Sequence, residues 1–139
     1  MAQANSPAQN KVFGVQAPII ISHNLTGTQP DTAGNYDAFF IAPFKCIVRE
    51  VRMNWAVASS SGTVQVEKLT SGQDKDAGTD LLSSAQATSG TADTPVTPAL
   101  TTTAASLEMA VGDRLGLVNA GTLTSGTNLN VTVLLTPIP

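Results

Sequence analysis

The stretch Ile47–Ala58, IVREVRMNWAVA, decides the fold class of this chain because apolar and polar side chains alternate along it. A period of two residues places successive side chains on opposite faces of a β-strand. We therefore expect a strand with one face on a core and the other facing water or a partner. The side chains expected on the core face are Ile47, Val51, Met53, Trp55 and Val57, with Arg49 as the only exception.

The same period recurs along the chain, interrupted by Gly, Pro, Asn and Ser, and no helical period is sustained. Thr63–Leu69 follows the turn Ser59–Gly62, so we expect it to form a hairpin with Ile47–Ala58. The chain is predicted to be all-β, an antiparallel β-sandwich or jelly roll of about seven or eight short strands. Further strands are expected at residues 18–22, 38–41, 95–100, 107–111, 114–118 and 129–135.

A polar segment precedes the first of these strands. We expect residues 1–17 to form an extended N-terminal arm, either flexible or docked on a partner, and residues 18–139 to form a single β-sandwich domain. Within the arm, Lys11, Val12, Phe13 and Val15 have few local partners, which is typical of a segment that docks on another chain. An edge strand of the sheet is the alternative, and the residues favour neither.

Composition excludes several classes of function. Charged residues make up 12% of the chain and the net charge is -3, without a basic run that would neutralise successive phosphates, so no nucleic-acid partner is expected. No apolar run reaches the roughly 18 residues that cross a bilayer, so no membrane partner is expected, and synthesis in a cytoplasm is predicted. A surface rich in hydroxyls and poor in charge costs little to desolvate, which favours a subunit of an assembly.

The residues that carry catalysis are scarce. His23 is the only histidine and Cys46 the only cysteine, so a triad or a His-based metal site lacks its other members. The chain contains no GxGxxG, GxxxxGK[ST] or GxSxG motif. We therefore predict no enzymatic activity, no catalytic residues and no cofactor, and we interpret Cys46 as a small buried side chain.

The segment DKDAGTD at Asp74–Asp80 places three carboxylates around a glycine. A tight turn can make such side chains converge on one Ca²⁺ ion, with Asp74, Asp76 and Asp80 as ligands. Lys75 lies inside the segment, and the remaining ligands of an EF-hand are missing. A solvated loop that needs no metal is therefore the favoured interpretation, and a Ca²⁺ site is the alternative.

The pair Asp113–Arg114 follows Gly112 and could belong either to a catalytic site or to a turn. Glycine supplies a positive φ and Asp bonds its own backbone, so we expect a tight turn here. Asp113 and Arg114 are then candidates for an inter-subunit pair rather than catalytic groups. The loop that follows, Asn119–Asn128, is long enough to cross from one sheet to the other before the last strand.

Three segments of the sequence resemble a known family. They are NWAVASSSGTVQVEKLTSGQDKDAGTDLLSS, LEMAVGDRLGLVNAGT and the closing NLNVTVLLTP. They are similar to the β-sandwich or jelly-roll decoration (cement) proteins of tailed-bacteriophage heads. In the family pattern a Gly-Thr-x-Leu-Leu element follows a hairpin, and a Gly-Asp-Arg-Leu turn leads to the last amphipathic strand. The matching residues are Gly78, Thr79, Leu81 and Leu82 in the first element and Gly112–Leu115 in the second.

This resemblance implies a structural virion protein that binds the outer surface of a phage capsid and stabilises the shell. It implies the major capsid protein as partner, self-association as a homotrimer, and a location on the capsid exterior. An alternative function is a glycan-binding or receptor-binding β-sandwich module of a tail fibre or other virion appendage. That module would use loops such as Asn119–Thr127.

Overall fold

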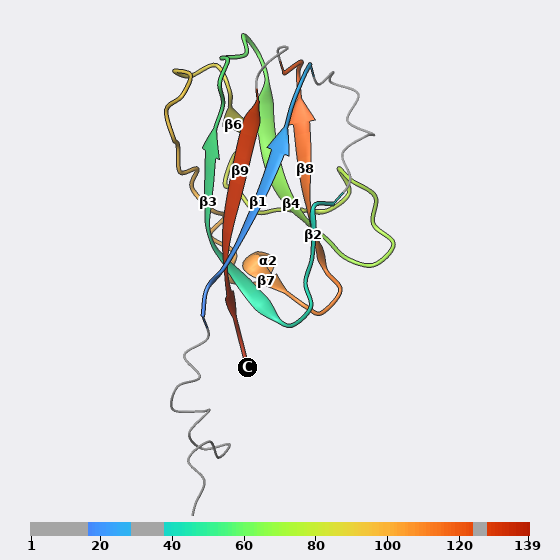
Figure 1. Ribbon diagram of the computed structural model, residues 1–139. Helices are drawn as coiled ribbons and strands as arrows, with labels where there is room; N and C mark the ends of the chain where they lie inside the picture. The colour runs from blue at the N-terminus through green and yellow to red at the C-terminus, as the bar shows by residue number, and fades with distance from the viewer. Residues whose placement is uncertain (1–16, 29–37, 124–127) are drawn as a thin grey trace, which may run out of the picture.

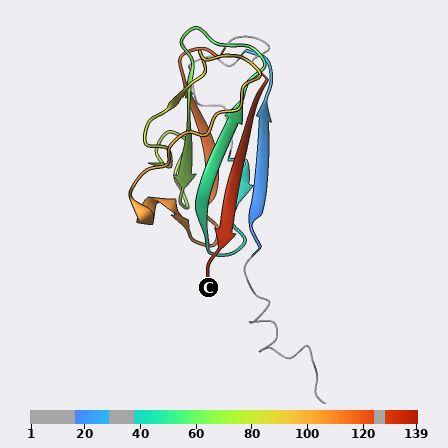
Figure 2. The ribbon, with the colours of Figure 1, turned by 90° about the vertical axis from the view of Figure 1, so that its left-hand side faces the viewer.

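The computed structural model describes residues 17–28, 38–123 and 128–139. These residues form two antiparallel β-sheets packed face to face, as Figures 1 and 2 show from two sides. The first sheet has the order β1 (Ile19–Leu25), β9 (Leu129–Pro137), β3 (Cys46–Asn54), β7 (Glu108–Met109). The second has the order β2 (Phe40–Ile41), β8 (Arg114–Ala120), β4 (Thr63–Leu69), β5 (Thr79–Asp80), with β6 (Gln86–Ala87) also paired to β4. A single helical turn, α2 (Ala104–Leu107), precedes β7.

The strand pairing is nested, which makes the sandwich a jelly roll. β1 pairs with β9, β2 with β8, β3 with β7, and β4 with β5 and β6. The chain thus resembles one long hairpin whose successive strand pairs are rolled alternately into the two sheets. The predicted all-β sandwich or jelly roll is confirmed, with nine strands in the described residues.

The predicted hairpin between Ile47–Ala58 and Thr63–Leu69 is wrong. β3 pairs with β9 and β7 in one sheet, whereas β4 pairs with β8, β5 and β6 in the other. The turn residues Ser59–Gly62 correctly indicate that the chain reverses. They do not indicate which sheet the next strand joins, because that depends on partners far away in the sequence. The predicted crossing after Asn119 is confirmed, since β8 and β9 belong to different sheets.

A β-bulge changes which side chains of β3 face the core. The pairing of β3 with β9 shifts register between Val48 and Glu50, so one extra residue flips the faces. Val48 is therefore buried and Ile47 only half-buried, the reverse of the prediction from strict alternation. Beyond the bulge the prediction holds for Val51, Met53 and Trp55, but it is wrong for Val57, which lies past the end of β3 and is exposed. Arg49, the one break in the pattern, is the residue that sits at the bulge.

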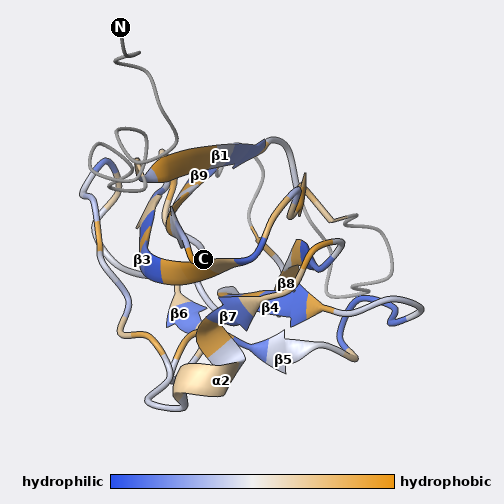
Figure 3. Cartoon of the chain, turned by 90° about the horizontal axis from the view of Figure 1, so that it is seen from below, coloured by the Kyte–Doolittle hydropathy of each residue, from blue (hydrophilic) through white to orange (hydrophobic). Residues whose placement is uncertain are grey.

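The core lies between the two sheets, which Figure 3 shows as two layers of strands seen nearly end on. Trp55 is its largest side chain, and its indole Nε1 donates a hydrogen bond to the Gly90 carbonyl at 3.1 Å. The other large apolar side chains that are almost fully buried are Met53, Leu69, Leu81, Met109, Leu115, Leu117, Leu123, Leu129 and Leu135. No helix in the described part of the chain has the length and apolar character to cross a membrane.

Candidate interaction surface

Three large apolar side chains point outward at one end of the sandwich. We call Ile41, Phe44 and Val111 the apolar tip; they are 64%, 38% and 69% exposed. Ile41 ends β2, Phe44 lies in the turn before β3, and Val111 lies in the turn between β7 and β8. Exposed apolar patches are candidate interaction surfaces, and the apolar tip is one such patch.

The frame of the apolar tip is two turns held together by their backbones. Ala42 N donates to the Asp113 carbonyl, and Gly112 N donates to the Ala42 carbonyl, both at 2.8 Å. Ala42 itself is buried and anchors this junction in the core. Gly112 has a φ of +90°, a conformation that favours glycine, so the turn Ala110–Asp113 closes as predicted.

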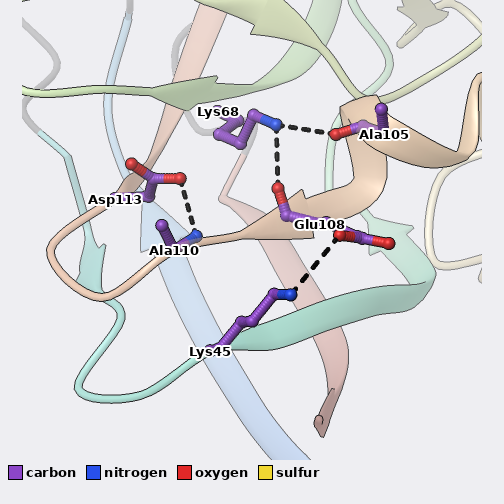
Figure 4. A network of polar contacts seen from close by, with 6 residues as sticks. All are labelled: Lys45, Lys68, Ala105, Glu108, Ala110 and Asp113. Atoms are coloured by element: carbon purple, nitrogen blue, oxygen red, sulfur yellow. Dashed lines mark hydrogen bonds and ion pairs between the residues drawn. The ribbon is translucent and has the colours of Figure 1, made fainter. Parts of the chain in front are cut away.

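Asp113 and Arg114 both have partners within their own chain. The Asp113 carboxylate Oδ2 accepts from Ala110 N at 2.8 Å and so closes its own turn (Figure 4). Arg114 Nη2 donates to the carbonyls of Thr70 and Gln73 at 3.1 and 2.6 Å. These contacts give the pair a role in positioning turns, and its predicted role between subunits stays a prediction.

Charged groups near the tip are also engaged within the chain. Lys68 Nζ donates to the carbonyls of Ala105 and Glu108 at 3.0 and 2.8 Å, where it satisfies the carboxyl-terminal end of α2 (Figure 4). The exposed Glu108 carboxylate lies 4.0 Å from Lys45 Nζ. Because these ammonium groups already have acceptors, the most available feature at this end is the apolar side chains.

A buried carboxylate organises the segment that contains Asp74, Asp76 and Asp80. Glu67 of β4 accepts from the backbone N–H groups of Asp76 and Gly78 at 2.7 and 3.1 Å. Burial lowers the pKa of Lys75, and the nearby Glu67 and Asp76 oppose that shift. Within the described ranges, no group of three His, Cys, Asp or Glu side chains is placed to hold a metal ion. The Ca²⁺ alternative at Asp74, Asp76 and Asp80 stays a prediction.

The structure separates the two residues that a nucleophilic dyad would need. His23 lies opposite Val131 on β9 and Cys46 lies opposite Pro137, six residues further along the same strand. At about 3.3 Å per residue this separation is roughly 20 Å. Burial, with a contribution from Asp113, raises the pKa of the Cys46 thiol. Cys46 is a buried side chain beside the tip, as interpreted from the sequence.

His23 has a different structural role. Its ring stacks on Phe39 with centroids 4.9 Å apart and planes at 14°. His23 belongs to the outer strand of one sheet, and Phe39 directly precedes β2, the outer strand of the other. The stack therefore joins the two sheets along one side of the sandwich. Burial lowers the pKa of His23, since desolvation disfavours the imidazolium.

The fold is shared with chains of two bacteriophage capsids. One is from the capsid of Ralstonia phage GP4, with a TM-score of 0.58 and 15% identity, covering 88% of this chain and 86% of that one. The other is from the capsid asymmetric unit of cyanophage Pam1, with a TM-score of 0.50 and 16% identity, covering 88% and 84%. The sequence matches no family model and no curated protein.

A second exposed surface, which the sequence analysis missed, lies on the outer face of the first sheet. A shallow depression of about 200 Å³ is lined by Ile20, Leu134, Thr132, Glu50 and Arg52. Ile20 is 66% exposed, although its neighbours in sequence, Ile19 and Ile21, face inward. The signal was present in the sequence, because three consecutive isoleucines in a strand must place at least one on the outer face.

The predicted contact residues Lys11, Val12, Phe13 and Val15 lie outside the described residues. Most of the predicted arm, residues 1–17, lies outside them too, and both remain predictions. The described chain begins at Ala17, next to β1. Ile19 lies opposite Leu135, and Ile138 N donates to the Lys45 carbonyl at 2.9 Å. The start of β1 and the end of the chain therefore lie at the same end of the sandwich as the apolar tip (Figure 1).

Proposed function

We propose that this protein is a structural protein of a bacteriophage particle that binds the outer surface of the capsid shell and stabilises it as a homotrimer. The observation that carries the proposal is the whole-chain likeness to two phage capsid chains. Each alignment covers 88% of this chain and well over four-fifths of the other, so the chains are similar in size as well as in fold. The likeness therefore extends over most of each of those two chains.

Fold alone does not specify function, so the surface must supply a second argument. The apolar tip offers Ile41, Phe44 and Val111 on turns already fixed by hydrogen bonds. Such a surface loses little conformational entropy when it docks, because its backbone is ordered beforehand. We assign the apolar tip as the part that meets the major capsid protein.

The proposed mechanism is stabilisation by mass action. A protein that binds only the assembled shell shifts the equilibrium away from its dissociated or unfolded subunits. Three linked copies would bind together, so contacts that are individually weak would hold each trimer in place. No substrate is turned over in this mechanism. The internal engagement of Asp113, Arg114 and Lys68 and the burial of Cys46 support such a non-enzymatic role.

Co-sedimentation with purified shells tests the proposal. The shells would be assembled from the capsid protein encoded nearest to this gene. We expect the wild-type chain to pellet with the shells and to raise their melting temperature. The double substitution Phe44→Asp and Val111→Asp should weaken binding more than tenfold, because two carboxylates would have to be desolvated at the interface.

Val57→Asp is the matched control. Val57 is also an exposed apolar residue, 40% exposed, but it follows β3 at the opposite end of the sandwich. We expect it to leave shell binding unchanged. Equal loss of binding for both variants would refute the assignment of the tip. Failure of the wild-type chain to bind or stabilise the shells would refute the proposed function.

A further inference from the structure

The first sheet has one long open edge. In the described part of the chain, β1 (Ile19–Leu25) pairs with β9 alone, and its other side carries no strand. The other outer strands, β2, β5, β6 and β7, are only two residues each. A seven-residue strand presents a row of unpaired backbone N–H and C=O groups that another strand can use.

Within β1 itself, the sequence and pairing lack the features that protect edges against strand addition. Natural edge strands are blunted by Lys, by Pro, by a bulge or by a short length. The sequence of β1, IIISHNL, contains no charged residue and no proline, and its pairing with β9 runs without a register shift. Ile20 also exposes most of its side chain on the outer face, next to Leu134 and Thr132 in the depression. The edge therefore has the character of a site for β-strand addition.

We propose that residues 11–15 of a second copy of this chain add to β1 as an extra strand. The inference deepens the proposed self-association and rests on it. The segment Lys11–Val15, KVFGV, has high β-propensity at Val12, Phe13 and Val15 and no proline. In an extended chain Phe13 shares a face with Lys11 and Val15. When this face lies on the same side of the sheet as Ile20, the Phe13 ring packs beside Ile20 across the new strand pair.

The geometry favours residues 11–15 of a second copy, rather than those of the same chain, as the strand that adds to β1. Ala17 precedes Pro18, and a residue before proline is restricted to extended conformations. The chain before β1 is thus disfavoured from turning back sharply along the β1 edge. Residues 11–16 span at most about 20 Å when extended. That length is sufficient for the segment of one copy to pair along the β1 edge of an adjoining copy.

This pairing is heterologous, because each copy would donate one segment and accept another. Head-to-tail contacts of this kind form a closed ring when the rotation between copies closes. Three copies related by a threefold axis would give the proposed trimer, with every β1 edge covered. Residues 11–15 of a neighbouring copy then cover the β1 edge, and the apolar tip remains available to bind the shell.

Disulfide trapping between full-length chains tests the proposal. A Phe13→Cys chain is mixed with an Ile20→Cys chain or, two residues along the same face, with a Ser22→Cys chain. We expect a covalent heterodimer with at least one of them. A Ser60→Cys chain is the control, because Ser60 is exposed in the loop that leads to β4, far from the start of β1. The native Cys46 is buried and should not react.

Sedimentation of full-length variants in the absence of shells provides the second arm. Phe13→Asp should shift the association equilibrium at least tenfold toward monomer. Gln9→Asp, which adds the same charge four residues earlier, should not. Trapping no stronger than the Ser60→Cys control, or an intact oligomer with Phe13→Asp, would overturn the proposal. So would a crosslink that forms only within one chain in a Phe13→Cys and Ile20→Cys double variant. Because no capsid is used, these outcomes are independent of whether the trimer binds a shell.

Discussion

The two ends of the sandwich differ in which kinds of side chain face outward and which face inward. At the apolar tip, Ile41, Phe44 and Val111 face outward. At the other end, hydroxyl side chains face inward: Ser59 and Thr88 are buried and bonded within the chain. We call Ser59, Gly62, Thr88 and Thr122 the hydroxyl end.

The hydroxyl end is closed by its own hydrogen bonds. Ser59 Oγ donates to the Thr122 carbonyl at 2.8 Å and accepts from Gly62 N at 3.0 Å. Thr88 Oγ1 donates to the Gly62 carbonyl at 3.0 Å. Polar groups that are satisfied internally stabilise the fold and leave little for a partner. The comparison teaches that one end bonds its buried hydroxyls internally, whereas the other end leaves large apolar side chains exposed.

The largest expected difference between the two ends comes from a pair of glycines. Gly121, near the hydroxyl end, has a φ of +68°, and an added Cβ would lie 2.6 Å from the Ser61 carbonyl oxygen. Gly112 at the tip has a φ of +90°, and an added Cβ would meet nothing within 4 Å. We expect Gly121→Ala to cost about 3 kcal/mol, from strain and overpacking, and Gly112→Ala about 1 kcal/mol, from strain alone. Urea unfolding of both variants measures this, and equal losses would break the comparison.

A buried hydroxyl gives the next effect. Ser59→Ala would leave both Gly62 N and the Thr122 carbonyl without this partner, and we expect a loss of about 2 kcal/mol in the free energy of unfolding. Ser60→Ala, next in sequence but exposed, should change stability by less than about 0.5 kcal/mol. Denaturant titration of the two variants provides the test. If Ser59→Ala is as mild as its neighbour, the hydroxyls do not hold this end together.

The smallest effect lies between the two ends, at the His23–Phe39 stack. The folded pKa of His23 is lowered, so the unfolded chain binds a proton more readily. The contribution of His23 is therefore complete above its unfolded pKa, about 6.5, and is lost as the pH falls from that value through the lower folded pKa. Melting curves from pH 7.5 to 5 should show a decline in the wild-type chain that is reduced in His23→Gln. Parallel curves for the two proteins would contradict this role, since His23 is the only histidine.

Local patterns predicted the strands well where one face is buried throughout. The final strand Leu129–Pro137 follows strict alternation, and its buried residues are those expected. The pattern failed at β3, where the bulge beside Arg49 moved Val48 into the core. The pattern also predicted a strand over residues 107–111 and did not reveal α2, which ends at Leu107. A four-residue helical turn is too short to show a period.

The candidate surface was less predictable than the fold. Gly112–Asp113 was correctly interpreted as a turn, but the partner of Asp113 is Ala110 and the partners of Arg114 are carbonyls about forty positions earlier in the chain. The exposure of Ile41, Phe44 and Val111 could not be inferred, because each is apolar and lies beside buried residues in the sequence. Only the pairing of two turns from distant segments places these side chains together.

The sequence by itself determined that the chain is all-β, where most strands lie, and that it has one histidine and one cysteine. Those properties follow from local periodicity and from composition, which any short window carries. The tertiary structure decided which sheet each strand joins, that the apolar tip and the hydroxyl end lie at opposite ends, and that β1 is a long edge. Sheet membership and exposure depend on contacts between residues distant in sequence, such as Ile41 with Arg114 and Ile19 with Leu135. Such contacts arise from the packing of the whole chain, so no local pattern encodes them.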